Sequence, residues 1–207
     1  MKESLKRILI LVRNRWGLSN SIKKSKESSI MILGNILHTS IRVTGNSKII
    51  LGEGCRIRNA SFKVIGNNNR VELEEGVFFS GTIELFGDEN LIKIGKNTRI
   101  NGADFIVHNG TTVEIGSSCL FSTEIDVRTT DSHSIFNEDG ERINLDKNIL
   151  IGKNVWIGRM VSILKGSNIG DGSVVGSMSL VSGVIPKRVI AVGIPAKTIK
   201  ENISWKE

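Results

Sequence analysis

A six-residue period constrains this chain more than any other feature. An aliphatic residue returns at every sixth position through six hexads: Ile151, Ile157, Ile163, Ile169, Val175 and Val181. A small residue follows in five of the six hexads, and Leu164 is the exception. No α-helix repeats every six residues, and a single strand does not alternate in this way. The pattern predicts a solenoid, whose stacked units bury an apolar face only against their neighbours.

A looser form of the same pattern extends towards the amino terminus. The anchors Leu51, Leu73, Ile94 and Ile115 are 22, 21 and 21 residues apart, and a segment rich in Gly and Asn precedes each anchor's strand. Gly and Asn tolerate the positive φ that sharp corners need. Three hexads make 18 residues, so the strict region predicts coils with three short sides. The wider spacing predicts the same coil with about three extra residues at its corners.

One interruption breaks the frame. Ile115, Phe121 and Val127 are in register with Ile151, whereas residues 133–144 lack the pattern and Leu145 falls back into it. These positions predict a 12-residue insertion that begins at a histidine. Insertions in a solenoid form surface loops, and loops on a rigid scaffold are where chemistry concentrates.

The positive charge of the chain is confined to its first residues. The 207 residues are 39% hydrophobic, which suits one domain, and the formal net charge is +7. Residues 1–26 hold eight basic residues and one acidic residue, so the remainder is balanced at 20 of each. The solenoid is therefore not a basic surface, and no nucleic-acid motif is present. We expect no nucleic-acid partner.

The basic segment predicts a short amphipathic helical arm, because its apolar residues recur at helical spacing: Leu5, Ile8, Leu9, Val12 and Trp16. The arm either packs on the first coil or the oligomer, or contacts a membrane surface or an anionic polymer. Its apolar run of five residues is far below the roughly 20 that span a bilayer. No cleavage site for a secretory signal is evident.

The two cysteines argue against a disulfide. Cys55 and Cys119 each follow a frame anchor by four residues, which places them at equivalent positions three coils apart. At ~4.8 Å per coil they lie ~14 Å from each other, too far to be bonded. Buried free thiols are typical of a reducing compartment. We expect a cytoplasmic protein, at the inner membrane face if the arm docks there.

Three segments carry a family resemblance: residues 151–158 (Ile-Gly-Lys-Asn-Val-Trp-Ile-Gly), the hexads that follow, and residues 191–196 (Ala-Val-Gly-Ile-Pro-Ala). Together they resemble the hexapeptide-repeat acyltransferases. The combination of residues 131–134, 140–144 and 155–158 is more similar still to the bacterial polysaccharide O-acetyltransferases, including those that act on polysialic acid. The resemblance covers roughly residues 45–200.

The resemblance implies a left-handed parallel β-helix, a homotrimer and the use of acetyl-CoA. The handedness comes from the resemblance alone, because general rules favour a right-handed crossover. The expected fold is thus an all-β solenoid with one protruding catalytic loop, a short helical arm and a short carboxy-terminal helix. Its expected parts are the arm at 1–26, the acyltransferase domain at 27–195 with the insertion at 133–144, and a helical tail at 196–207.

His133 is the candidate catalytic base, because an imidazole can accept a hydroxyl proton near neutral pH. A sugar hydroxyl needs that step before it can attack a thioester. Asp131 is the first candidate to orient His133, ahead of Glu124, Asp126 and a backbone carbonyl. The resemblance places Trp156 beside the histidine, where its indole would line the acceptor or thioester pocket. Packing between subunits is the alternative role for Trp156, and both can hold.

The remaining site residues follow from similarity to the galactoside and maltose acetyltransferases, which implies cofactor contacts along the late coils: Gly158, Arg159, Gly176, Ser177, Ser182, Pro195, Lys197 and Lys200. The glycines would admit the pantetheine arm, and the lysines would meet the anionic end of coenzyme A. Relatives often have arginine in place of the lysines and a small residue in place of Arg159. A solvated helix face is the alternative explanation for Lys197 and Lys200.

A metal site is not expected, since the three histidines lack ligand spacing. The sequence therefore predicts an acetyl-CoA-dependent O-acetyltransferase acting on a surface-polysaccharide sugar of capsule, lipopolysaccharide or exopolysaccharide. Two alternatives stay open. One is acetyl transfer to a small molecule such as a free sugar, a nucleotide sugar or an antibiotic, and the other is a trimeric scaffold without catalysis.

Overall fold

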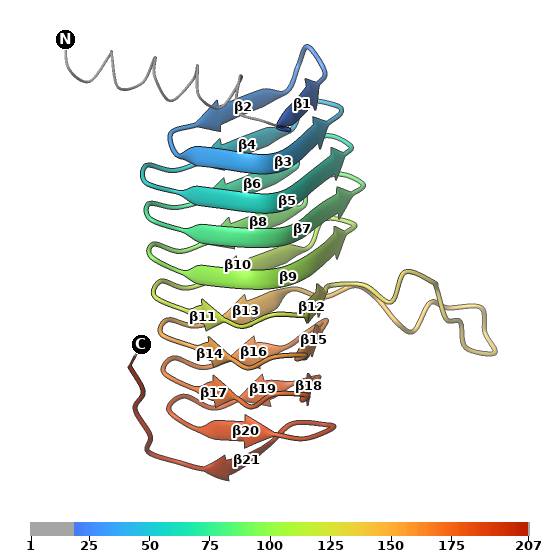
Figure 1. The fold of residues 1–207 in the computed structure, drawn as a ribbon. Helices are drawn as coiled ribbons and strands as arrows, with labels where there is room; N and C mark the ends of the chain where they lie inside the picture. Colours follow the sequence, from blue (N-terminus) through green and yellow to red (C-terminus); the bar gives the residue numbers. More distant parts are fainter. Residues whose placement is uncertain (1–18, 207) are drawn as a thin grey trace.

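The computed structural model describes residues 19–206, and these form a tall three-sided solenoid built of strands (Figure 1). One side is an eight-stranded parallel sheet: β2 (Ser29–Ile32), β4 (Lys48–Leu51), β6 (Arg70–Leu73), β8 (Leu91–Ile94), β10 (Thr112–Ile115), β13 (Ile149–Ile151), β16 (Asn168–Ile169) and β19 (Val184–Ile185). Each coil of the solenoid adds one strand to this sheet. The all-β solenoid expected from the sequence is confirmed.

A second sheet wraps the other two sides of the coil. Its long strands, which cover both sides, are β3 (Asn35–Val43), β5 (Arg56–Ile65), β7 (Phe78–Phe86) and β9 (Arg99–His108). Further along, each long strand is replaced by two short ones: β11 (Leu120–Phe121) and β12 (Ile125–Arg128), β14 (Trp156–Ile157) and β15 (Ser162–Leu164), β17 (Val174–Val175) and β18 (Leu180–Val181). The sheet begins at β1 (Ser21–Lys24) and ends at β20 (Ile190–Val192) and β21 (Lys197–Lys200).

The aliphatic positions of the repeat fill the inside of the prism. All six hexad anchors from Ile151 to Val181 are buried, and so are the four upstream anchors from Leu51 to Ile115. Strand register stacks equivalent positions on each other, since Ile151 pairs with Ile169 and Val71 with Ile92. The sequence frame therefore predicted both the core and the register.

Buried polar side chains close the corners between the sides. In the wider coils Asn90 donates through Nδ2 to Asn69 Oδ1 at 2.8 Å, and its Oδ1 accepts from the backbone N–H of Gly110 at 3.1 Å. In the strict hexads a serine hydroxyl takes this position. Ser173, for example, donates to the carbonyl oxygen of Pro186 at 2.6 Å. Buried backbone groups at a corner need such partners, which explains polar residues inside an apolar core.

Both cysteines are buried free thiols, as expected. Burial raises the pKa of Cys55 and of Cys119 to about 11. Each Sγ donates to a carbonyl oxygen of the next coil, at 3.0 Å to Glu74 and 3.1 Å to Gly152. These thiols are therefore corner-closing groups like the asparagines, and they are protonated at neutral pH.

Three expectations about the edges of the domain are corrected. The expected carboxy-terminal helix is wrong: Lys197–Lys200 form β21, which pairs antiparallel with β20, and no helix occurs within residues 19–206. The helical arm falls largely on residues 1–18, outside the described residues. Its last part is not helical, because Ser21–Lys24 form β1 against β3, so the solenoid begins before residue 27.

The insertion is also longer than the expected 133–144. The chain leaves the coil after Arg128 and rejoins it at Ile149, and Leu145, expected back in frame, is 59% exposed. The register shows why: Ile115 pairs directly with Ile151, so the whole excursion sits within one coil. Periodicity alone predicted that Leu145 is back in the coil, because it matches the frame. In the structure its segment has not yet returned to the coil.

Among residues 19–206 no helix could cross a membrane.

Candidate active site

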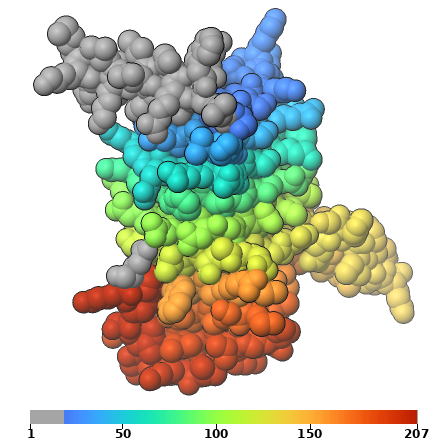
Figure 2. All heavy atoms as spheres, in the orientation of Figure 1, coloured from blue at the N-terminus to red at the C-terminus, as the bar shows by residue number. Residues whose placement is uncertain are grey.

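The loop of residues 129–148 stands clear of the solenoid, as the space-filling view shows (Figure 2). Its base is fixed to the coil. The hydroxyl of Thr111 donates to Thr129 Oγ1 at 2.7 Å, the backbone N–H of His108 donates to the same oxygen at 3.2 Å, and Lys147 N–H donates to the carbonyl oxygen of Thr129 at 3.0 Å. The two ends of the loop are therefore bound to each other and to the neighbouring coil.

The loop has internal order as well. Phe136 and Arg142 form an antiparallel bridge, and Asn137 accepts through Oδ1 from the backbone N–H of Glu141 at 2.8 Å. Gly140 has φ 79°, which a residue with a Cβ adopts at a cost. The loop therefore forms a short hairpin-like structure, and its side chains have defined positions.

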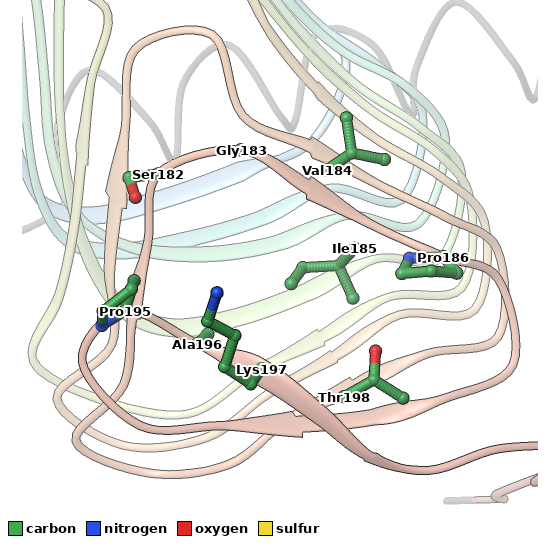
Figure 3. Close-up of a pocket in the computed structure, with 9 residues that line it drawn as sticks. All are labelled: Ser182, Gly183, Val184, Ile185, Pro186, Pro195, Ala196, Lys197 and Thr198. Atoms are coloured by element: carbon green, nitrogen blue, oxygen red, sulfur yellow. The ribbon is translucent and has the colours of Figure 1, made fainter.

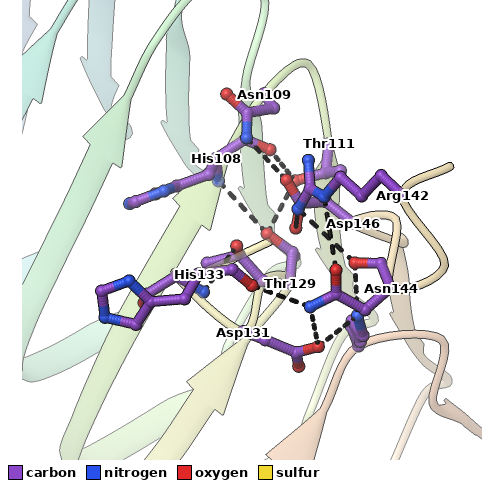
Figure 4. Close-up of polar contacts among 12 residues, drawn as sticks. His108, Asn109, Thr111, Thr129, Asp131, His133, Arg142, Asn144 and Asp146 are labelled. Atoms are coloured by element: carbon purple, nitrogen blue, oxygen red, sulfur yellow. Dashed lines mark hydrogen bonds and ion pairs between the residues drawn. The ribbon is translucent and has the colours of Figure 1, made fainter. Parts of the chain in front are cut away.

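His133 lies on this loop with its main chain held from both sides (Figure 4). Its backbone N–H donates to the carbonyl oxygen of Asp131 at 2.8 Å, and its own carbonyl oxygen accepts from Asn144 Nδ2 at 2.8 Å. The residue is exposed, and its imidazole has no hydrogen bond to any residue within 19–206. The ring is therefore presented to solvent on a fixed backbone, which leaves both nitrogens for a substrate.

Asp131 fastens the loop. Its Oδ2 accepts from Lys165 Nζ at 2.6 Å and from Asn144 Nδ2 at 2.8 Å, and these two bonds hold the pKa of the carboxyl below its usual range. Asp131 therefore reaches His133 through Asn144 and the main chain, and the structure does not join the carboxylate to the imidazole. Lys165 belongs to the next coil and also donates to the carbonyl oxygen of Asn144 at 2.8 Å.

Sequence reasoning missed Asn144 and Lys165 as parts of this site. Asn144 falls within the motif at 140–144 that carried the resemblance, so a signal for it existed. No sequence signal pointed to Lys165, because its contact with Asp131 depends on how the loop folds back over the next coil. The contact joins residues 34 apart, a separation that matches neither period of the solenoid.

Trp156 lies on a different side of the prism from the loop. It points outward from β14 and is 41% exposed, whereas the loop leaves from the end of β12 (Figure 1). Its indole packs against that of Trp205, with 5.9 Å between ring centroids, and Trp205 Nε1 donates to the carbonyl oxygen of Asn154 at 2.8 Å. Within one chain, the structure does not bring Trp156 and His133 together.

The first group of expected cofactor residues lies at the corners that follow β14 and β17. A Cβ at Gly158 would lie 2.6 Å from Ser177 N, and one at Gly176 would lie 2.5 Å from Val192 Cγ1. Close packing of the coils therefore already requires both glycines. Ser177 Oγ accepts from the backbone N–H of Arg159 at 3.2 Å, and Arg159 Nε donates to Glu124 Oε1 at 3.0 Å.

The second group lies at the carboxy-terminal end of the solenoid. Ser182, Pro195 and Lys197 line a pocket of about 420 Å³ between the last coil and β21 (Figure 3). The lining mixes apolar side chains with one ammonium group, which suits a ligand that has an apolar part and an anionic part. Lys200, at the far end of β21, is exposed and is not part of the lining.

Within residues 19–206, no group of three or more His, Cys, Asp or Glu side chains could hold a metal ion.

Comparison with known proteins shows what this chain is similar to. Residues 148–183 match the model of the bacterial transferase hexapeptide (six repeats). The chain is 36% identical over 138 residues to a polysialic acid O-acetyltransferase of Neisseria meningitidis, a match that covers 66% of this chain and 61% of that protein. The chain therefore contains the hexapeptide repeat of the bacterial transferases, and it is similar in sequence to a polysialic acid O-acetyltransferase over about two thirds of its own length.

Solved structures show the same similarity. The polysialic acid O-acetyltransferase OatWY superposes with a TM-score of 0.85 at 29% identity, over 91% of each chain. A hexapeptide-repeat acetyltransferase of Vibrio cholerae, solved with acetyl-CoA, gives a TM-score of 0.52 at 26% identity, over 63% of this chain and 70% of that one. The architecture is therefore shared with acetyltransferases along most of its length, including the wider coils.

Proposed function

We propose that this protein transfers an acetyl group from acetyl-CoA to a hydroxyl of an acidic bacterial surface polysaccharide, of which polysialic acid is the leading candidate. One observation carries the proposal: His133 presents an unengaged imidazole from a fastened loop, on a scaffold that matches a polysialic acid O-acetyltransferase over 91% of its length. Such a site suits a polymeric acceptor, because an exposed loop leaves room for a long chain on both sides of the reacting sugar.

In the proposed reaction His133 accepts the proton of the acceptor hydroxyl as the oxygen bonds to the thioester carbonyl carbon. The carbon–sulfur bond then breaks, the acetyl ester is released, and the imidazolium returns its proton to the departing thiolate. Asp131, Asn144 and Lys165 hold the main chain of His133 in place, so the histidine meets its substrate in one geometry.

The proposal includes a left-handed coil and a homotrimer. His133 and Trp156 lie on different sides of one prism, so both can act on one substrate only if the loop of one copy reaches β14 of another. We also propose that the reaction takes place in the cytoplasm, where acetyl-CoA is made.

The cofactor contacts are proposed to run from the corner residues to the end pocket: Gly158, Arg159, Gly176, Ser177, Ser182, Pro195, Lys197 and Lys200. Two geometric facts support this path. Ser177 and Arg159 are hydrogen bonded to each other, and the pocket places an ammonium group beside apolar walls. Lys197 would meet a phosphate of coenzyme A, and Pro195 would offer an apolar face to its adenine.

The test is turnover by His133→Ala with polysialic acid as acceptor. We expect kcat to fall about 100-fold or more while the affinity for coenzyme A stays within twofold. Ser134→Ala, an exposed neighbour on the same loop, is the control and should keep wild-type turnover. A His133→Ala variant that melts at the wild-type temperature and acetylates at the wild-type rate would overturn the assignment of the base.

A further inference from the structure

The residues that follow β21 run back along the outside of the solenoid. Figure 1 shows the chain rising from the bottom coil along the left edge of the lowest coils. The backbone N–H of Ile203 donates to the carbonyl oxygen of Arg188 at 3.0 Å, and Trp205 Nε1 donates to the carbonyl oxygen of Asn154 at 2.8 Å. Residues 201–206, which we call the strap, therefore join the last coil to the coil of β14.

The strap lies beside a column of apolar side chains that point away from the core. Trp156, Val174 and Ile190 pair in register on β14, β17 and β20, and each alternates with an inward residue of its own strand. Val174 is only 9% exposed in spite of this outward position, so other groups cover it. The outer face of these coils is thus packed, and the strap brings two half-buried apolar side chains to it, Ile203 and Trp205.

The ring of Trp205 is held in one orientation. Its Nε1–H can only donate, and the bond to Asn154 uses this donor. Asn154 lies at the corner that leads into β14, so the acceptor of this bond belongs to the coil that carries Trp156. The ring of Trp205 also packs against the indole of Trp156, with 5.9 Å between centroids and 46° between planes. Tilted aromatic pairs at this separation attract each other.

Trp156 has no polar anchor of its own. Its indole N–H makes no hydrogen bond to a residue within 19–206, and 41% of the residue is exposed. An exposed side chain exchanges between staggered rotamers on the ps–ns timescale unless a neighbour restrains it. Trp205 is such a neighbour, because its own ring is bonded to the same coil. The pair therefore combines a fixed support with an indole that stays accessible to a ligand.

We propose that Trp205 is a positioning residue of the active site, which holds the Trp156 indole in the orientation in which that ring meets the substrate. This inference rests on the proposed function, because that function brings Trp156 and His133 to one substrate. It adds that a segment outside the repeat takes part in the site, although it carries no group that reacts.

The first experiment measures turnover in Trp205→Ala, Trp205→Phe and the control Ser204→Ala, an exposed neighbour on the strap. At saturating acetyl-CoA and polysialic acid, we expect kcat to fall about tenfold in Trp205→Ala, because a displaced indole no longer orients the substrate. Trp205→Phe keeps a ring beside Trp156 and loses the bond to Asn154, so its kcat should fall only about threefold. Ser204→Ala should match wild type.

A double-mutant cycle tests whether Trp205 acts through Trp156. In a Trp156→Phe background, adding Trp205→Ala should lower kcat by less than twofold, because the ring that Trp205 positions is already gone. A residue that only stabilised the fold would lower turnover equally in both backgrounds. The melting temperature of each variant is recorded alongside.

Fluorine NMR on protein labelled with fluorotryptophan follows the ring itself and needs no turnover. The chain has three tryptophans, and the Trp156 signal is the one that disappears in Trp156→Phe. In Trp205→Ala we expect the Trp156 signal to move towards that of free fluorotryptophan. In Ser204→Ala it should keep its wild-type position.

Three results would overturn the positioning role while leaving the reaction intact. They are an unchanged Trp156 signal in Trp205→Ala, an equal loss of turnover in both backgrounds of the cycle, and a rise in turnover in Trp205→Ala. The last would mean that the strap covers the site. A wild-type protein without turnover would instead contradict the proposed function, and the fluorine signals would still decide whether Trp205 holds Trp156.

Discussion

The upper coils, residues 35–108, and the lower coils, residues 149–192, are two versions of one three-sided turn. In the upper coils equivalent residues are 21 or 22 apart, strands of nine or ten residues cover two sides, and Phe62, Phe79 and Phe105 stack in the core. In the lower coils the spacing is 18 or 16, strands have two or three residues, and the core holds Ile and Val. A few added residues per coil thus make room for aromatic rings.

The two regions also differ in how they close their corners. The upper coils have both a side-chain pair that bonds from one coil to the next, Asn69 with Asn90, and hydroxyls that bond to backbone, such as that of Ser47, whereas the serine hydroxyls of the lower coils bond to backbone. The expected catalytic and cofactor residues all lie in the loop, in the lower coils or in the segment that follows them. The comparison teaches that coil width and corner chemistry change together, while the axial stacking of the core does not change.

The largest expected effect tests that shared core. Ile169→Asp should destabilise the protein by several kcal/mol, because Ile169 is buried and a carboxylate there has no partner. Asn168→Asp, one residue away and exposed, should change stability by less than about 0.5 kcal/mol. Ile92→Asp in the upper coils should match Ile169→Asp. Urea denaturation measures all three, and a stable Ile169→Asp would contradict the common core.

The next effect separates the two kinds of corner. Asn90→Ala removes four hydrogen bonds, including those from the backbone N–H groups of Gly110 and Thr111, and should cost about 2–3 kcal/mol. Ser173→Ala removes two and should cost about 1 kcal/mol. The same denaturation experiment compares them. If Ser173→Ala were less stable than Asn90→Ala, the hydrogen bonds of Asn90 would contribute less to stability than those of Ser173.

A smaller effect concerns the lower end alone. Lys197→Glu places a negative charge on the wall of the end pocket and should weaken coenzyme A binding about tenfold, with kcat at saturating acetyl-CoA within twofold. Lys23→Glu makes the same change on β1, at the opposite end of the solenoid, and should leave the affinity unchanged. Calorimetric titration with coenzyme A measures both affinities. If Lys197→Glu and Lys23→Glu bound coenzyme A equally well, Lys197 would not be part of the cofactor site.

The smallest effect is a dependence of the loop on pH. The pKa of Asp131 lies below its usual value of 3.8 in the folded protein, so its bonds to Lys165 and Asn144 stabilise the loop above that value. This stabilisation is lost as the pH falls through the lowered pKa. The amide signal of His133 should therefore shift below about pH 4, whereas the side-chain amide signals of Asn69 and Asn90, which bond to each other and carry no charge, stay constant. Asp131→Asn should abolish the shift, and its persistence would exclude Asp131 as the cause.

The sequence was enough to predict the solenoid, its core and its register, because every coil repeats the same inward positions. Corner chemistry was visible only as Gly and Asn, since which side chain meets which carbonyl depends on the width of each coil. The loop was located from the missing period, but its length was underestimated because Leu145 matches the frame by chance. Periodicity describes the coil and contains no information about a segment that leaves it.

The candidate site was predictable to a similar degree. His133 and Trp156 stood out through residues shared with a family, but their separation on one prism could not be read from spacing alone. Lys165 and Trp205 were missed, because each contacts the site from a neighbouring coil or from the tail. The tail was expected to be a helix. Pairing with β20 decided its conformation.

The reversal of the chain at β21 determines where the solenoid ends. A stack of parallel strands exposes a row of unpaired N–H and C=O groups at its last coil, and such an edge can add another molecule in the same register. At the end of this molecule β21 runs antiparallel along β20, and the residues before it cover the last coil. An incoming parallel strand would find that edge occupied by a strand of opposite polarity with exposed lysines. The reversal thus closes the β20 side of the last coil to a further parallel strand, which hinders the stacking of a second copy into a fibre.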